Sequence, residues 1–325
     1  MTEHGQTETA ADGGVLETPG NAQGLALIAL IIGALTLGMS PILVRLSELG
    51  PTASAFHRVF LALPVLWLWS ALEKRQQAPA SKPRAATISK TRAATTKDYA
   101  VMALAGFFFA GDLAFWHWSL QFTTVANATL LATMAPIWVT LGAFVLFKER
   151  FSKLFLFGVA VAIVGAAVLM GDSLHLSKDR LFGDLLGLVT GMFFGAYMLT
   201  VGRLRAHFST AAIMLLSTVV TALILLPATL FSGETLIAVT LSGWLVLLAL
   251  ALLTHVGGQG AIAYALAHLP ASFTSVAMLL EGVAAVFLAW IILAETPGSW
   301  QIVGACIVIG GIVIARRGSL LQRQT

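Results

Sequence analysis

The sequence predicts an all-α polytopic membrane protein with ten transmembrane helices, arranged as two inverted five-helix repeats. Three observations predict this fold: an apolar composition, a series of apolar segments long enough to cross a bilayer, and an internal repeat. Of the 325 residues, 58% are hydrophobic and 10% are charged, whereas soluble domains have about 45–50% and about 25%. The mean hydropathy is +0.89. These values exclude most soluble enzymes, nucleic-acid binders and secreted disulfide-rich proteins.

The apolar segments follow one another from Gly24 almost to the C-terminus. About 20 residues cross a hydrocarbon core of ~30 Å at 1.5 Å per residue. Ten segments come near this length: 24–46, 52–72, 99–121, 124–147, 153–171, 181–203, 209–230, 242–266, 271–293 and 299–316. Residues 1–23 are polar and acidic, so we expect a disordered tail there. Residues 73–98 are expected to form a flexible basic loop.

The basic residues lie mainly on one side of the predicted helices. With the N-terminus placed in the cytoplasm, fifteen of the 19 Lys and Arg residues fall on cytoplasmic segments, seven of them within 73–98. Cytoplasmic loops of membrane proteins carry such an excess. We therefore expect a multi-pass protein of the cell (inner) membrane with both termini in the cytoplasm, which agrees with an even number of spans.

An internal repeat divides the chain into halves, 24–171 and 172–317, followed by a short tail, 318–325. At an offset of 146 residues, Glu149, Gly158 and Gly165 recur as Glu295, Gly304 and Gly311. Each half holds five spans, and because five is odd, the second half must be inverted in the membrane. The basic residues change accordingly, since Lys148, Arg150 and Lys153 correspond to Ala294, Thr296 and Ser299. Inverted repeats are typical of secondary transporters.

The repeated motifs resemble those of a known family. The stretches are Met134-Ala135-Pro136 and Phe147-Lys148-Glu149-Arg150 in the first half, and Leu280-Glu281-Gly282 and Leu293-Ala294-Glu295-Thr296 in the second. Over about 24–317 the chain is similar to the drug/metabolite transporter superfamily, in particular its EamA-type members, and Arg58 in the second span also fits. The resemblance implies ten helices around a central cavity, and exporters of amino acids and other small metabolites are among the family's members. Gly282 stands where the family usually carries proline.

Ionisable residues within the spans are the candidate site residues, because charges are costly in lipid and tend to face a cavity or a partner. Asp112, His255 and Glu281 lie near the middle of the third, eighth and ninth spans. Helical spacing places Asp112 and Trp116 on one face of the third span. The equivalent face of the eighth span carries His255 and Gln259. We expect Asp112, His255, Gln259 and Glu281 to form the polar part of a substrate site.

Other residues are given candidate roles from their positions along the predicted spans. Trp116, Trp138 and Trp290 are candidate apolar walls, and Arg58 could hold a substrate carboxylate or instead pair with Glu48. Glu149 and Glu295 lie at span ends, where they could act as gates, caps or ion-pair partners. Pro136 can bend the fourth span, and Gly282 holds the equivalent motif position. Purely structural roles remain open for Asp112 and His255, as buried residues hydrogen-bonded to a neighbouring helix.

The sequence favours a secondary transporter. It has no phosphate-binding loop of the G-x-x-x-x-G-K-[ST] type, and we expect no cofactor and no metal. It is not expected to be an enzyme: a membrane-embedded aspartate dyad would need two close carboxylates, and Asp112 and Asp184 lie at different depths. The expected partners are a small-molecule substrate, the lipid bilayer and, as a candidate coupling ion, the proton; nucleic acid is excluded.

The residue types suggest two substrate classes. A cavity with aromatic walls, one or two carboxylates and an arginine suits an amino acid with an apolar or aromatic side chain, exported by alternating access. The alternative is efflux of cationic drugs by proton antiport, with Asp112 or Glu281 as the counter-ion and tryptophans supplying cation–π contacts.

Overall fold

The computed structural model describes residues 19–77, 94–119, 121–123, 125–171, 180–294 and 296–322. Over these ranges every regular element is helical. Ten helices are long and apolar enough to span a membrane: Ala22–Leu46, Pro51–Arg75, Thr96–Ser119, Asn127–Phe147, Lys153–Met170, Leu181–Leu204, Thr210–Phe231, Leu241–Ala265, Ala271–Ile292 and Ser299–Gln322. The ten predicted spans are therefore confirmed. Most residues of the expected acidic tail and basic loop lie outside the described ranges.

Five of the ten spans are single helices: α5 (Thr96–Ser119), α8 (Lys153–Met170), α9 (Leu181–Leu204), α10 (Thr210–Phe231) and α15 (Ser299–Gln322). The tenth span continues to Gln322, beyond its predicted end at 316. The guanidinium of Arg316 lies 5.0 Å from the centre of the Phe273 ring, and Gly318 packs against the backbone of Phe155 in α8. Contacts with neighbouring helices thus extend this helix beyond its apolar segment.

The other five spans are interrupted. The first comprises α1 (Pro19–Leu37) and α2 (Ser40–Leu46), and the second α3 (Pro51–Phe60) and α4 (Leu63–Gln77). The fourth comprises α6 (Val125–Ala132) and α7 (Ala135–Phe147), and the ninth α13 (Ala271–Ala277) and α14 (Leu280–Leu293). The eighth comprises α11 (Leu241–Ala249), the π-helix η3 (Leu250–Gln259) and α12 (Gly260–Ala265). Such interruptions at membrane depth are tolerated where the backbone is covered by protein or lines a cavity.

The breaks in the fourth and ninth spans occupy equivalent positions of the repeat. In the fourth span Pro136 lies in the first turn of α7, where the missing N–H costs nothing. The ninth span breaks within one residue of the equivalent place although Gly282 replaces the proline. There the carbonyl of Met278 accepts a tight-turn hydrogen bond from Glu281 N at 2.9 Å. The interruption therefore belongs to the fold and does not depend on the proline.

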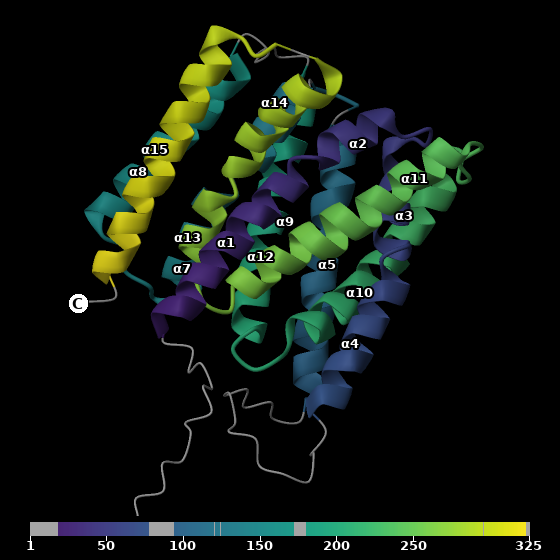
Figure 1. Ribbon diagram of the computed structural model, residues 1–325, viewed down its shortest axis with the longest axis horizontal. Coiled ribbons are helices and arrows are strands. Elements are labelled where there is room, and N and C mark those ends of the chain that lie inside the picture. Colours follow the sequence, from purple (N-terminus) through teal and green to yellow (C-terminus); the bar gives the residue numbers. More distant parts are fainter. Residues whose placement is uncertain are drawn as a thin grey trace, which may run out of the picture.

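α8 and α15 form an antiparallel pair that joins the two halves (Figure 1). Gly158 of α8 packs against Ala315, and Gly304 of α15 packs against Leu169. These two contacts are equivalent under the 146-residue offset, because Gly158 corresponds to Gly304 and Leu169 to Ala315. The duplicated halves are thus related by a pseudo-two-fold axis that passes through this pair. Since each half holds five spans, they are inverted relative to each other, as predicted.

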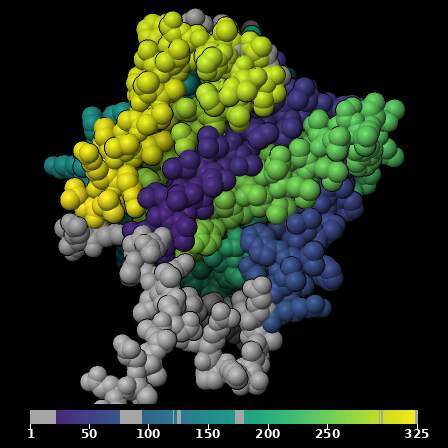
Figure 2. Space-filling view, viewed as in Figure 1, coloured from purple at the N-terminus to yellow at the C-terminus, as the bar shows by residue number. Residues whose placement is uncertain are grey.

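Two helix bundles flank the centre of the molecule. In one, α9 packs against α5, α6 and α7; in the other, α1 packs against η3, α12, α13 and α14. Each bundle therefore combines spans from both repeats, and the repeat symmetry relates one bundle to the other. Glycines allow the close approach: Gly191 meets the backbone of Ala132 in the first bundle, and Gly38 meets the carbonyl of Glu281 in the second. Figure 2 shows α1 crossing one face of the molecule between α14 and α12.

The start of α1 and the end of α15 lie at the same end of the molecule, which we call the terminal face; the other end is the opposite face (Figure 1). On the opposite face two glutamates each cap a helix of the other repeat. Glu48 accepts hydrogen bonds from Val239 N (2.8 Å) and from the backbone and hydroxyl of Thr240, at the start of α11. Glu234 accepts from Ala53 N at 2.8 Å in the first turn of α3. Thr240 is the N-cap residue of α11, and Ala53 lies in the first turn of α3. N–H groups at the start of a helix lack partners within their own helix. The bonds from Thr240 and Val239 lower the pKa of Glu48 below its ordinary value.

Candidate functional site

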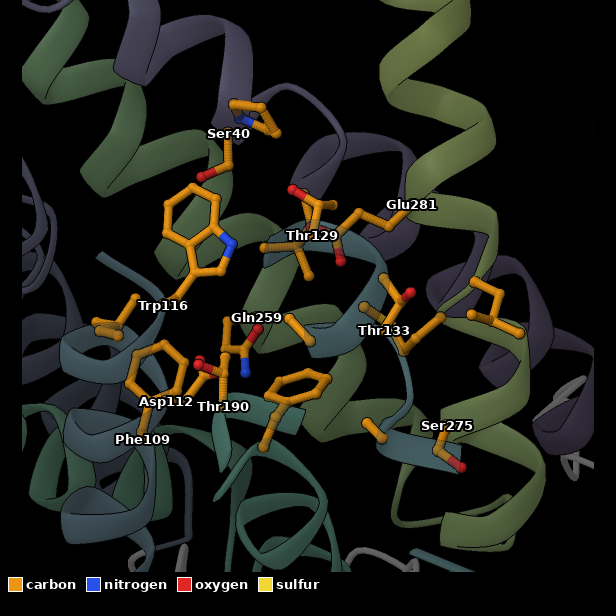
Figure 3. A pocket seen from close by; sticks show the side chains of 18 of the residues that line it. Ser40, Phe109, Asp112, Trp116, Thr129, Thr133, Thr190, Gln259, Ser275 and Glu281 are labelled. Atoms are coloured by element: carbon orange, nitrogen blue, oxygen red, sulfur yellow. The ribbon is translucent and has the colours of Figure 1, made fainter. Parts of the chain in front are cut away.

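A cavity of about 130 Å³ lies between the two bundles (Figure 3). Both bundles contribute to it, together with α3. Its polar lining comprises Ser40, Arg58, Asp112, Thr129, Thr133, Thr190, Gln259, Ser275 and Glu281. Its apolar lining includes Leu37, Phe109, Leu113, Trp116, Phe194 and Met278. A polar cavity of this volume has room for a small molecule or several waters.

Arg58 enters the cavity from α3, whose start is fixed by Pro51 in its first turn. Its Nη1 donates a hydrogen bond to Ser40 Oγ at 2.9 Å. Its Nε is buried and has no hydrogen-bond partner within the part of the chain that the structure describes. Arg58 interacts electrostatically with both Glu281 and Asp112, yet the described part of the chain contains no direct ion pair between them. Glu48, the other partner considered from the sequence, caps α11 instead.

Asp112 and Glu281 lie on opposite sides of the cavity (Figure 3). Asp112 projects from α5, in the same region as Gln259 and Thr190. Glu281 lies in the first turn of α14, directly after the break in the ninth span. A carboxylate is favourable there because the N-terminal end of a helix carries partial positive charge. Both residues are half-buried and line the cavity.

Two half-helices begin at this cavity. Pro136 lies in the first turn of α7 and lines the cavity, and Glu281 does so in the first turn of α14. Discontinuous helices whose N-terminal ends point at a central site are characteristic of secondary transporters, where they bind anionic groups. The N-terminal end of α14 already carries a carboxylate, that of Glu281, in its first turn. The end of α7 has no acidic residue in its first turn, so it can attract an anion from solution.

Aromatic side chains form the wall and the floor of the cavity. Trp116 and Phe109 line it from α5 and Phe194 lines it from α9. Below them, Tyr197 is 2% exposed, with its ring centre 5.1 Å from Phe109 and 6.1 Å from Phe194. Trp116 lies near the end of α5 at the opposite face, whereas Tyr197 lies toward the terminal face. Phe109 and Tyr197, both buried, therefore lie on the side of the cavity that is toward the terminal face.

Three residues predicted for the site lie elsewhere. His255 is 1% exposed in η3; its Nε2 is 2.8 Å from the hydroxyl of Thr218, and its ring centre is 5.4 Å from that of Phe109. Phe109 and His255 are equivalent in the repeat, so their contact lies on the pseudo-two-fold axis. Trp138 lines a separate lateral groove, not the cavity. Trp290, considered as a further wall, is 48% exposed on the outer surface.

The remaining motif residues lie at helix ends or outside the cavity. Glu149 is exposed just beyond α7. Partial burial raises the pKa of its carboxyl group, and the guanidinium of Arg203 opposes that shift. Gly282 is not part of the cavity lining and adjoins Leu169. Glu295 lies outside the described residues. The equivalent residues Lys148 and Ala294 share a left-handed conformation, with φ of 56° and 54°, so the ends of α7 and α14 are alike.

Sequence reasoning missed the small polar residues of the lining. Thr133, Thr190 and Ser275 each donate a hydrogen bond to a carbonyl of their own helix. Hydroxyl side chains in apolar helices commonly donate to a backbone carbonyl in this way. A Ser or Thr in a span therefore does not by itself indicate a binding site. In the sequence, Thr129, Thr133 and Pro136 follow an i, i+4, i+7 spacing, which would place them on one face of an unbroken helix. That pattern beside a motif proline was the available clue.

Comparisons with known proteins agree with this architecture. The family model for the EamA-like transporter family matches residues 24–171 and 181–317. A protein of Archaeoglobus fulgidus named an uncharacterized transporter is 24% identical over 282 residues, covering 83% of this chain and 89% of the relative. A Salmonella typhimurium protein named a probable amino-acid metabolite efflux pump is 29% identical over 225 residues, covering 66% of this chain and 75% of the relative.

A solved crystal structure superposes with a TM-score of 0.74 over 94% of this chain and 99% of the other chain. Its sequence is 17% identical, so it establishes a shared fold alone. The family model covers most of the chain and both of its halves. This multi-pass membrane protein is a transporter and not an enzyme, and it belongs to the EamA-like transporter family.

Proposed function

We propose that this protein is a secondary transporter that exports amino acids with apolar or aromatic side chains, or closely related metabolites. The observation that carries the proposal is the composition of the central cavity. It combines a guanidinium with an unpartnered Nε, two carboxylates that form no direct ion pair with it, and an aromatic wall. A zwitterion with an apolar side chain is complementary to all three. The name of the Salmonella relative, a probable amino-acid metabolite efflux pump, supports the same substrate class.

Each part of an amino acid has a counterpart in the cavity. Its carboxylate can be held by Arg58, with the N-terminal end of α7 adding favourable partial charge. Its ammonium group can be held by Asp112 or Glu281. Its side chain can pack against Trp116 and Phe109, both of which line the same cavity. Among the described residues Ser40 is the one hydrogen-bond partner of Arg58, so the substrate would supply the further acceptors.

Alternating access follows from the pseudo-symmetry of the two bundles. In the proposed cycle, the aromatic floor around Tyr197 is the barrier between the cavity and the terminal face in this state. If the two bundles exchange conformations, the equivalent barrier forms at the opposite face and the cavity opens toward the terminal face. With both termini in the cytoplasm of a cell (inner) membrane, as the distribution of basic residues predicts, substrate would load from the cytoplasm and leave from the opposite face.

The test is exchange of labelled amino acids by purified protein in liposomes, with and without a pH gradient. We expect saturable exchange of leucine or phenylalanine. Arg58→Ala should weaken apparent affinity about 10- to 100-fold, since one charged hydrogen bond contributes about 1.5–3 kcal/mol. Trp290→Ala, on the outer surface, is the matched control and should exchange normally. Absence of saturable amino-acid exchange, or Arg58→Ala behaving like the control, would overturn the proposal.

One observation favours a second candidate, the efflux of organic cations by proton antiport. The cavity holds two carboxylates against a single guanidinium, so with both ionised it carries an excess of negative charge. A cation without a carboxylate would use Glu281 or Asp112 and would not need Arg58. Transport of such a cation that is driven by a pH gradient, lost in Glu281→Gln and retained in Arg58→Ala, would select this candidate over amino-acid export.

A further inference from the structure

The central cavity contains one contact that the sequence motifs did not single out, between Arg58 and Ser40. The guanidinium Nη1 of Arg58 donates a hydrogen bond to Ser40 Oγ at 2.9 Å. Ser40 is 8% exposed and lines the cavity (Figure 3). The two residues come from different spans, Ser40 from α2 and Arg58 from α3. Because a hydroxyl oxygen accepts a hydrogen bond without carrying a charge, this contact orients the guanidinium and leaves its positive charge uncompensated.

The break in the first span fixes the position of Ser40. α2 begins at Ser40 and carries Pro41 in its first turn, where proline is compatible with a helix start. Just before it, Gly38 packs against α14. A Cβ atom added at Gly38 would lie 2.7 Å from Ala284 Cβ and 2.9 Å from the carbonyl oxygen of Glu281. The start of α2, which carries Ser40, is therefore held against the helix that carries Glu281.

The internal repeat indicates that the fold does not require this polar pair. An offset of 158 residues aligns the first two spans with the sixth and seventh. At this offset Ser40 corresponds to Met198, which is fully buried, and Arg58 corresponds to Leu216. The second half thus builds the equivalent helices with two apolar residues. Since an ionisable side chain within a span is costly, the guanidinium and its hydroxyl partner favour a role in the site over a role in packing.

Arg58 also has two carboxylates within electrostatic reach. Its charge acts on both Glu281 and Asp112, yet among the described residues neither forms a direct ion pair with it. A direct ion pair would compensate the charge of Arg58 and occupy its donors. The bond to Ser40 instead holds Nη1 on a neutral group, so the charge stays available to a ligand.

We propose that Ser40 is a positioning residue for substrate recognition, which holds Arg58 clear of Glu281 and Asp112 so that the guanidinium meets the carboxylate of the substrate. This inference rests on the proposed function, because it takes an amino acid as the substrate. Without the Ser40 hydroxyl, Nη1 is released and Arg58 pairs with one carboxylate of the cavity. A substrate carboxylate is then bound less well. The second carboxylate of the cavity remains for the ammonium group, so recognition of that group does not pass through Ser40.

The test is exchange of labelled phenylalanine by the purified full-length protein in liposomes, with phenethylamine as a competing ligand. Phenethylamine has the ring and the ammonium group of phenylalanine but no carboxylate. Ser40→Ala removes the hydroxyl, and Ser40→Thr keeps one. Ser217→Ala is the matched control, because Ser217 is also buried, donates to Ile213 O of its own helix at 2.8 Å and does not line the cavity.

We expect Ser40→Ala to raise the apparent KM for phenylalanine about tenfold, as for loss of a hydrogen bond to a charged group, with the maximal rate and the inhibition by phenethylamine within about twofold of wild type. Ser40→Thr and Ser217→Ala should keep the wild-type KM. Normal elution in gel filtration checks that each variant is folded.

Two results would overturn the inference: a KM in Ser40→Ala equal to that in Ser217→Ala, or an equal loss of affinity for phenylalanine and phenethylamine, which is the sign of a general structural effect. The proposed function has a separate outcome. If the wild type exchanges no phenylalanine, the proposed function itself fails. If the wild type exchanges it and Arg58→Ala weakens exchange while Ser40→Ala is normal, the positioning role of Ser40 alone fails.

Discussion

The contact between α8 and α15 makes a sharp prediction about stability, because neighbouring glycines of one helix have opposite surroundings. A Cβ atom added at Gly311 would lie 2.6 Å from Ala162 Cα and 2.7 Å from Ala162 Cβ, and would overlap the backbone N of the same residue. A Cβ added at Gly310 would meet nothing within 4 Å. We therefore predict that Gly311→Ala destabilises the protein and that Gly310→Ala does not.

The magnitude follows from two effects. Replacing glycine by alanine favours a helix by up to about 1 kcal/mol, and this gain is common to both variants. Carbon atoms pack at about 3.5–4.0 Å, so the new methyl at Gly311 is about 1 Å too close. Overpacking of this kind costs about 1–3 kcal/mol. Since the propensity gain cancels, Gly311→Ala should be less stable than Gly310→Ala by about 1–3 kcal/mol.

The assay is reversible unfolding by sodium dodecyl sulfate in mixed micelles, which gives the free energy of unfolding of each variant. The pseudo-symmetry supplies an internal check. Gly165 is the equivalent of Gly311, and a Cβ there would lie 2.9 Å from the carbonyl carbon of Ile307, so Gly165→Ala should be destabilised to a similar degree. Equal stability of the Gly310→Ala and Gly311→Ala variants would refute the close contact between α8 and α15 described above.

Three further predictions concern other parts of the molecule. The pKa of Glu48 is lowered in the folded protein. Its carboxylate therefore stabilises the fold at any pH above the ordinary pKa of 4.5, and this stabilisation is lost as the pH falls through the lower pKa of the folded state. Glu48→Gln should reduce the melting temperature at pH 7 and make the melting temperature depend less on pH in that acidic range. Thr218→Val leaves buried His255 without its partner and should destabilise the protein by about 1–3 kcal/mol, with unchanged substrate affinity. Asp184 accepts hydrogen bonds from Thr123 Oγ1 (2.5 Å) and Asn127 Nδ2 (3.0 Å), so Asp184→Ala should also destabilise by about 1–3 kcal/mol.

Each of these variants has a control. For Glu48→Gln it is the wild type followed over the same pH range, and identical curves would contradict the capping role. For Thr218→Val it is Thr229→Val, because the Thr229 hydroxyl donates to a carbonyl of its own helix, Leu225 O, at 2.8 Å. Equal losses of stability in the two variants would show that the effect does not depend on His255. For Asp184→Ala the control is Asp184→Asn, which keeps an acceptor oxygen and should lose less stability than Asp184→Ala.

The positions of the spans could be predicted because they depend on length and composition alone. A bilayer requires about 20 apolar residues per crossing, whatever the neighbouring helices do. The inversion of the second half followed from the odd number of spans in each repeat. The high cost of charge in lipid likewise singled out Asp112, Glu281 and Arg58, which the structure places around one cavity.

Tertiary packing decided which helix faces meet and where the helices break. His255 and Trp138 share the residue types expected of a site, yet one hydrogen-bonds to Thr218 and the other faces a lateral groove. The break in the ninth span lacks a proline, and the π-helix around His255 has no compositional signal. A sequence specifies how far each segment must reach across a membrane, because that requirement is set by the lipid. The face that each helix turns toward its neighbours is set by close packing between segments distant in the sequence, so only the assembled structure reveals the cavity.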